Sequence, residues 1–104
     1  MKEAKFFLLV RFSIAPQAVE PVMRWLDGGH VAEVLRTPGF LWCNRVKTDD
    51  GGYVMLYGIE SRAAFEAYEA NSALKAKFAR ERAPFEKHMR IERLCGELEK
   101  SYAA

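Results

Sequence analysis

The chain has 104 residues, of which 50% are hydrophobic and 29% are charged, and this length fits one globular domain over residues 1–104 rather than two. Sixteen Lys and Arg residues against fourteen Asp and Glu residues give a net charge of +2, and because the charges are interspersed we expect no nucleic-acid partner. The first apolar run, Phe6 to Val10, is too short for a signal peptide or a membrane span, so we expect a cytoplasmic protein with no membrane partner.

The first predicted element is a strand from Phe6 to Phe12. Both of its alternating faces are apolar, with Phe6, Leu8, Val10 and Phe12 on one face and Phe7 and Leu9 on the other. Such a strand needs helices on one face and a second sheet on the other, which one short chain does not supply. An aromatic content of 12% is also generous for so small a core, so we expect some of this apolar surface to contact a partner.

An amphipathic helix is predicted after Ala15-Pro16-Gln17, which ends the strand. Its apolar stripe consists of Ala18, Val19, Val22, Met23 and Leu26. Pro21 has no backbone NH and belongs close to the first turn, so the helix should begin near Gln17 or Ala18.

The segment from Trp25 to His30 combines a helix end, a flexible joint and a titratable side chain. Gly28-Gly29 ends or breaks the first helix, because glycine readily adopts the left-handed conformation of a helix C-cap. Beyond the break, one face of a second, short helix carries His30, Val31, Val34 and Leu35.

A turn at Thr37-Pro38-Gly39 leads into the strongest hairpin signal of the chain. Two strands, Phe40 to Thr48 and Tyr53 to Ile59, flank Asp49-Asp50-Gly51-Gly52. If Asp50-Gly51 is the tip, the cross-strand pairs are Val46 with Met55, Asn44 with Tyr57, and Trp42 with Ile59. Cross-strand partners project to the same side, so Trp42, Asn44, Tyr57 and Met55 would share one face. A slip of one residue would separate them.

A second helical region opens at Ser61, a good N-cap, and turns Ala64, Phe65 and Tyr68 inward. Asn71-Ser72 interrupts or re-caps the helix. The continuation places Leu74 and Phe78 inward, Lys75, Lys77, Arg80 and Glu81 outward, and ends at Pro84.

The last predicted strand runs from Met89 to Leu98, and its many charges suit a sheet edge. The order is therefore strand, helix, strand, strand, helix, strand. This order predicts an α+β, ferredoxin-like βαββαβ fold with a four-stranded antiparallel sheet, whose second and fourth strands lie at opposite edges. Cys43 and Cys95 would then be too far apart to form a disulfide.

Four segments carry a family resemblance: Phe7 to Phe12, Trp25 to His30, Thr37-Pro38-Gly39-Phe40 and the weak final strand. Together they resemble the dimeric alpha/beta-barrel superfamily, and within it small uncharacterised stand-alone members in which a first helix ending in Trp and then His precedes a Pro-Gly-Phe turn. The superfamily includes antibiotic-biosynthesis monooxygenases, muconolactone isomerases, polyketide cyclases, haem-degrading enzymes and dye-decolorising peroxidase relatives.

The resemblance implies a homodimer whose two sheets pack face to face, and a small-molecule pocket between the sheet and the helices of each subunit. His30 alone matches a recurring feature of these proteins, at the end of the first helix. Members with different chemistries use different residues, so the resemblance transfers no mechanism.

His30 is the candidate catalytic residue, because an imidazole with a pKa near 6.5 can act as a general acid or base. The alternative is a capping or core-edge histidine bonded to the backbone. The candidate ligand-binding residues are Trp25, Trp42, Asn44 and Tyr57. Their aromatic members could equally fill the core or a dimer interface, whereas a buried Asn44 would need a polar partner.

The remaining polar residues leave several roles open. Arg11 and Arg45 could orient a ligand or pair with carboxylates across a dimer, and His88 lies in a charged, solvated segment. His30 and Glu33 have a spacing that can converge on a metal, but no third ligand is evident, and a haem would need an axial ligand and a wide pocket. We therefore expect neither a metal nor a cofactor.

Two hypotheses follow for the function. The first is a cofactor-independent enzyme of monooxygenase, isomerase or cyclase type that acts on a hydrophobic aromatic or polyketide-like ligand, with His30 as the proton-transfer residue. It requires a cavity that His30 faces. The alternative is a non-catalytic dimeric ligand-binding or assembly module, which predicts no cavity large enough for a substrate and no effect of His30→Ala on ligand binding.

Overall fold

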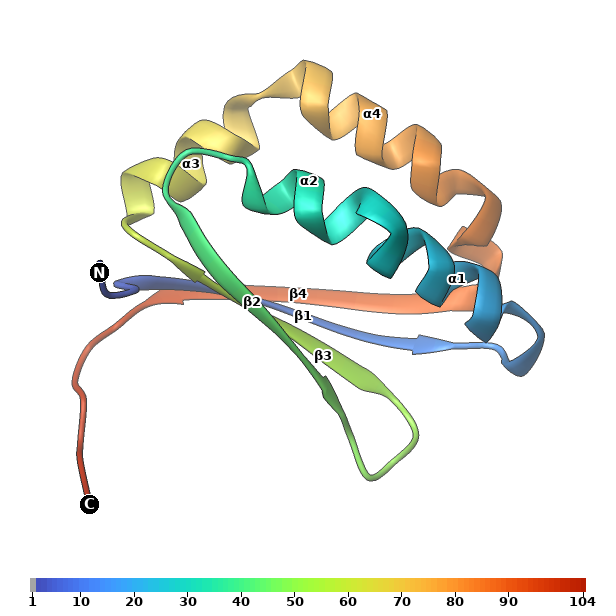
Figure 1. Cartoon of the computed structure of the whole chain (residues 1–104), viewed down its shortest axis with the longest axis horizontal. Coiled ribbons are helices and arrows are strands. Elements are labelled where there is room, and N and C mark those ends of the chain that lie inside the picture. Colours follow the sequence, from blue (N-terminus) through green and yellow to red (C-terminus); the bar gives the residue numbers. More distant parts are fainter. Residues whose placement is uncertain (1) are drawn as a thin grey trace.

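The computed structural model describes residues 2–104 and confirms the ferredoxin-like α+β fold (Figure 1). Four strands, β1 (Phe6–Ile14), β2 (Phe40–Lys47), β3 (Tyr53–Ile59) and β4 (Met89–Glu97), form one antiparallel sheet in the order β2-β3-β1-β4. The second and fourth strands occupy opposite edges, as predicted. Cys43 on β2 and Cys95 on β4 are free thiols.

All helices lie on one face of this sheet (Figure 1). They are α1 (Val19–Trp25), α2 (Val31–Leu35), α3 (Arg62–Ala70) and α4 (Ser72–Arg82), with 3₁₀ turns at Pro16–Ala18 and Ala83–His88. Within the described part of the chain, none of these helices has the length and apolar character needed to cross a membrane.

Gly28-Gly29 breaks the first helical region without separating it into two detached helices. A π-helical turn, Leu26–His30, joins α1 to α2, and Gly29 departs from helical geometry within it at φ 158° and ψ −27°. Asp27 in this turn accepts two hydrogen bonds from the guanidinium of Arg45 on β2, at 2.6 and 3.2 Å. This bidentate pair attaches the π turn to the edge strand.

The second helical region has the two caps that the sequence predicts. The Ser61 side chain accepts a hydrogen bond from the backbone N–H of Ala64 at 3.1 Å and begins α3. Asn71 likewise accepts from Leu74 at 3.1 Å and begins α4. Each cap satisfies a helix N–H that has no partner within the helix.

The core lies between the helices and the inner face of the sheet. Phe6 of β1, Val22 of α1 and Ile59 of β3 are 0% exposed, and the ring of Phe6 stacks on that of Phe65 with centroids 5.0 Å apart. The inner face of β1 is therefore the one that carries Phe6, a choice that the alternation of two apolar faces had left open.

The predicted register of the hairpin is wrong by one residue. Cys43 lies opposite Tyr57, and Asn44 lies opposite Leu56. The reason is the loop, because Thr48 N donates to Gly52 O at 2.9 Å and leaves a three-residue turn, Asp49-Asp50-Gly51, instead of a two-residue turn. Gly51 has a φ of 87°, as the last residue of such a turn requires.

This register places Trp42 and Asn44 on the outer face of the sheet and Tyr57 on the inner face. The indole of Trp42 lies across Gly58, where a Cβ would come within 2.2 Å of the ring. It also lies 6.2 Å from the ring of Phe7. A glycine at position 58 therefore lets the indole lie flat on the sheet.

The outer face of the sheet has no helix over it (Figure 1). We define the outer apolar face as the side chains Phe7, Leu9, Trp42, Val46, Val54, Leu56 and Leu94, whose positions follow from the strand pairing. Leu94 is 68% exposed and Val46 is 51% exposed. This face accounts for the second apolar side of β1 seen in the sequence.

Candidate functional site

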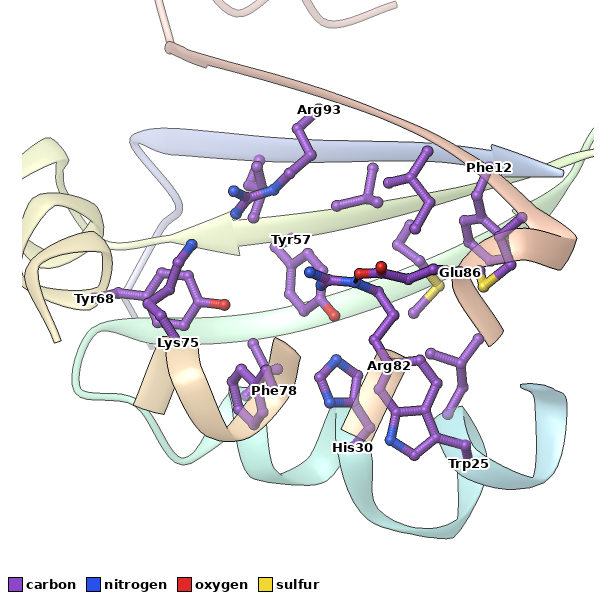
Figure 2. Close-up of a pocket in the computed structure, with 17 residues that line it drawn as sticks. Phe12, Trp25, His30, Tyr57, Tyr68, Lys75, Phe78, Arg82, Glu86 and Arg93 are labelled. Carbon is purple, nitrogen blue, oxygen red and sulfur yellow. Dashed lines mark hydrogen bonds and ion pairs between the residues drawn. The ribbon is translucent and has the colours of Figure 1, made fainter. Parts of the chain in front are cut away.

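A cavity of about 440 Å³ lies between the inner face of the sheet and the helices (Figure 2). Its apolar wall comes mainly from β1 and β3 and includes Leu8, Val10 and Met55. Trp25, His30 and Tyr57 also line it. Its size and apolar wall are typical of a site for a small organic ligand.

The π turn places His30 at this cavity. The imidazole stacks on the indole of Trp25 with ring centroids 4.3 Å apart, and it meets the ring of Phe78 edge-on at 4.7 Å. Burial lowers the pKa of His30 most, and Arg82 lowers it further, while Glu81 and Glu33 act in the opposite direction. His30 is therefore uncharged at neutral pH.

The two nitrogens of His30 have different surroundings. Nδ1 is buried and has no hydrogen-bond partner among residues 2–104. A buried N–H without an acceptor is rarer in proteins than an under-used acceptor, so Nδ1 is assigned as the unprotonated nitrogen of the neutral ring. Nε2 then carries the hydrogen. It belongs to the edge of the ring that points toward the Tyr57 hydroxyl (Figure 2).

Tyr57 points its hydroxyl into the same space from β3 (Figure 2). Burial is the main cause that raises the pKa of Tyr57, and the neighbouring Cys43 adds to the increase. The side chain therefore stays a neutral phenol that can donate a hydrogen bond into the cavity.

The polar side of the cavity is lined by Lys75 and Arg82 of α4, Glu86 of the following 3₁₀ turn and Arg93 of β4 (Figure 2). Glu69 of α3 does not line the cavity but pairs with two of these side chains. Arg82 contacts Glu86 at 3.3 Å. Lys75 and Arg93 both contact Glu69, at 2.6 and 3.2 Å. We refer to Lys75, Arg82, Arg93, Glu69 and Glu86 as the charged rim.

The structure brings together three of the five predicted site residues, namely Trp25, His30 and Tyr57. Trp42 and Asn44 do not join them, because they were assigned to this face from the wrong register. Arg45 is engaged by Asp27 of its own chain, and Arg11 contacts Asp50 at 3.2 Å. The alternative of a backbone-bonded His30 finds no support, since Nδ1 has no partner in the described part of the chain.

The charged rim is absent from the predictions, and Lys75 was predicted to point outward. A signal was present in the sequence. Lys75 and Arg82 are seven positions apart with Phe78 between them, a spacing that places all three on one face of a helix. Residues 2–104 contain no group of three or more His, Cys, Asp or Glu side chains that could hold a metal ion.

The lowered pKa of His30 predicts a loss of stability on mild acidification. The unfolded chain binds a proton near pH 6.5 and the folded chain binds it only at lower pH, so the stability present above pH 6.5 falls as the pH drops through the folded pKa. We expect a slope of at most about 1.4 kcal/mol per pH unit as the pH falls below about 6.5. Urea unfolding of the wild type and of His30→Gln at several pH values measures how the free energy of unfolding depends on pH. The same pH dependence in both proteins below about pH 6.5 would contradict the prediction.

No family model and no curated protein sequence matches the chain. Solved structures do match it. SnoaB, a cofactor-independent oxygenase from Streptomyces nogalater, is 19% identical with a TM-score of 0.67, over 94% of this chain and 96% of that one. A monooxygenase from the gene ActVA-Orf6 of Streptomyces coelicolor, in complex with the ligand Nanaomycin D, is 22% identical with a TM-score of 0.67, over 97% and 93%.

A third similar structure is the heme-degrader MhuD from Mycobacterium tuberculosis with two hemes bound in its active site. It is 19% identical, with a TM-score of 0.68 over 94% of this chain and 99% of that one. At these identities the similarity establishes the ferredoxin-like fold alone, and the chemistry must be argued from the residues of the site.

Proposed function

We propose that the protein binds a hydrophobic aromatic or polyketide-like molecule in the cavity and acts on it as a cofactor-independent enzyme. The observation that carries this proposal is the cavity of about 440 Å³, which both His30 and Tyr57 face. In this proposal Trp25 and the apolar wall hold the rings of the ligand. His30 and Tyr57 contact the oxygen at which the reaction occurs.

The assignment of His30 follows from its environment. A neutral imidazole with its hydrogen on Nε2 donates to a ligand oxygen and can pass that proton on, which is the acid half of general acid–base catalysis. SnoaB and the ActVA-Orf6 monooxygenase support the reaction class, since both are oxygenases with this fold.

One of the two predictions made by the alternative, a non-catalytic module, does not agree with the structure. Such a module was expected to have no cavity large enough for a substrate, and the structure contains one. Its second prediction concerns ligand binding after His30 is replaced, and the same experiment tests the proposed function.

We expect aromatic acids, phenols or quinones to raise the melting temperature of the protein, because a ligand that binds only the folded state stabilises it. His30→Ala should weaken the binding of an active compound roughly tenfold, the value of one hydrogen bond of about 1.4 kcal/mol. His88→Ala is the matched control, because His88 does not line the cavity. If no compound binds, or if His30→Ala binds as tightly as the wild type, the proposed role of His30 is contradicted.

We further propose that two copies of the chain pair through the outer apolar face. Support comes from the exposure of Leu94 and Val46 and from the absence of any helix over this face in residues 2–104 (Figure 1). Large uncovered apolar patches are typical of interaction sites. A two-fold pairing would cover the face on both copies at once. The mass in solution tests this proposal, and only 11.9 kDa monomer at micromolar concentration would contradict it.

A further inference from the structure

We propose that Asp27 and Arg45 are positioning residues, whose ion pair holds the glycine joint Gly28-Gly29 in place and so keeps His30 at the cavity. The inference rests on the proposed function, because it concerns the side chain to which that proposal assigns the proton transfer. It follows from the few contacts of the joint and from the two-point geometry of the ion pair.

The glycine joint has no side chain that could pack against the rest of the molecule. An added Cβ at Gly28 or at Gly29 would have no neighbouring atom within 4 Å in the described part of the chain. Gly29 also departs from helical geometry. Glycine has more conformational freedom than any other residue. Packing at the joint therefore does not determine the direction in which the chain continues toward His30.

Asp27 lies immediately before the joint and connects it to the sheet. Its two carboxylate oxygens accept hydrogen bonds from the two terminal nitrogens of Arg45, at 2.6 and 3.2 Å. A bidentate pair of this kind determines the relative orientation of two groups as well as their distance. Arg45 belongs to β2 of the same sheet that forms the apolar wall of the cavity. The pair therefore sets the position of the joint relative to that wall.

The backbone of the π turn shows what the pair supports. The N–H of Val31 donates to the carbonyl of Leu26, and this hydrogen bond spans the joint. Leu26 is buried in the core, whereas the side chain of Asp27 is 59% exposed and holds the turn from the outside. His30 lies at the far end of the turn and points into the cavity (Figure 2). Opening of the turn would therefore move the imidazole.

The ion pair does not act on His30 through its charge. The pKa of His30 depends first on burial and then on the charges of Glu81, Arg82 and Glu33. The two charges of the ion pair are opposite and cancel each other at a distance. A change in the titration of His30 after the pair is broken would therefore report a change in its position.

Asp27→Ala tests the inference without any ligand. We expect amide hydrogen exchange at Val31 to become about two- to fivefold faster, the range for the loss of a partly exposed ion pair. The pKa of His30, measured by NMR, should move up toward 6.5, because a loosened ring is less buried. Arg45→Lys keeps the charge but cannot form the bidentate pair, so it should change both values in the same direction.

Gly28→Ala distinguishes a positioning role from a general gain in stability. Position 28 has helical geometry and open space around it, so an alanine fits there and restricts the joint. Combined with Asp27→Ala, it should return the exchange at Val31 and the pKa of His30 toward their wild-type values. If the double variant keeps the His30 pKa of Asp27→Ala, restriction of the joint does not position the ring and the inference is overturned.

The matched control is Glu20→Ala, which removes the carboxylate of another exposed ion pair, with Arg24, from the same helical region. It should leave the exchange at Val31 and the titration of His30 as they are in the wild type. Wild-type values of both quantities in a folded Asp27→Ala variant would overturn the inference. A control that shifts both as strongly as Asp27→Ala does would overturn it too.

Binding of an aromatic compound separates the inference from the proposed function. If Asp27→Ala loosens His30 but no compound binds to the wild type, the positioning role is supported and the proposed function is contradicted. If a compound binds through His30 and Asp27→Ala changes neither its affinity nor the two NMR values, the proposed function is supported and the inference is overturned. A two- to fivefold weaker affinity in Asp27→Ala, together with the two NMR changes, supports both.

Discussion

Leu94→Glu is expected to separate the proposed dimer into monomers. Leu94 is 68% exposed in the single chain and lies on the edge strand β4, where it pairs with Leu9 of β1 on the outer apolar face. In a dimer, each copy of the variant would bury a carboxylate with no partner, which costs about 3–5 kcal/mol. Two such carboxylates cost about 6–10 kcal/mol per dimer, so the dissociation constant should rise by roughly four orders of magnitude or more.

Light scattering across a range of protein concentrations measures this change. Because Leu94 is exposed in the chain, the variant should keep the circular dichroism spectrum of a folded protein. Ala79→Glu is the matched control, since it adds the same charge at an exposed position on α4, on the other side of the molecule (Figure 1). A Leu94→Glu variant with the mass of the wild-type dimer at every concentration would show that this face is not the interface.

Gly39→Ala should be strongly destabilising. Gly39 has a φ of 86°, and a Cβ at this position would lie 2.5 Å from the Cβ of Ala64 on α3. The left-handed backbone costs about 1 kcal/mol for an alanine. The clash adds about 1–3 kcal/mol, because Ala64 has no flexible side chain that could move away.

Gly51→Ala separates the two contributions. Gly51 has almost the same φ, 87°, but a Cβ at this position would have no neighbouring atom within 4 Å, so only the cost of the backbone remains. Urea unfolding at one fixed protein concentration gives both losses. Equal losses for the two variants would show that α3 can move away from the turn at no cost.

Local chemistry was sufficient to predict the order of the elements. Ser61 and Asn71 have side chains that cap helices, and the turn at Thr37-Pro38-Gly39 needs the left-handed residue that it has. Each of these features depends on residues within a few positions of one another, and a single sequence contains all of that information.

The register of the hairpin could not be decided in the same way. Asp-Gly suits a two-residue turn and also the end of a three-residue turn, and the two choices differ by one residue. Thr48 decides between them, because its hydroxyl accepts a hydrogen bond from the N–H of Gly52 at 3.1 Å and so supports the longer turn. The placement of Trp42 and Asn44 depended on this single choice.

The charged rim could not be predicted from the sequence for a different reason. Arg82 lies on α4 and Arg93 lies on β4, so the two side chains meet at the cavity only in the folded chain. Charges at a sheet edge and on a helix are usually solvated, so their residue types alone do not reveal a shared site. Three of the predicted residues do line the cavity. Trp25 and His30 form a ring pair on one continuous segment, and Tyr57 is an aromatic residue of an inner strand.

The π turn at Leu26–His30 also sets the rotational phase of the helices on either side of it. Val22 and Val34 lie twelve positions apart, and a regular helix, which rotates roughly 100° per residue, would turn them about 120° away from each other. Both are nevertheless buried, at 0% and 3% exposure. The extra residue of the π turn reduces the effective separation to eleven positions, or about 20°. The second glycine thus acts as a one-residue insertion that keeps both halves of the helix on the core and leaves His30 at the cavity.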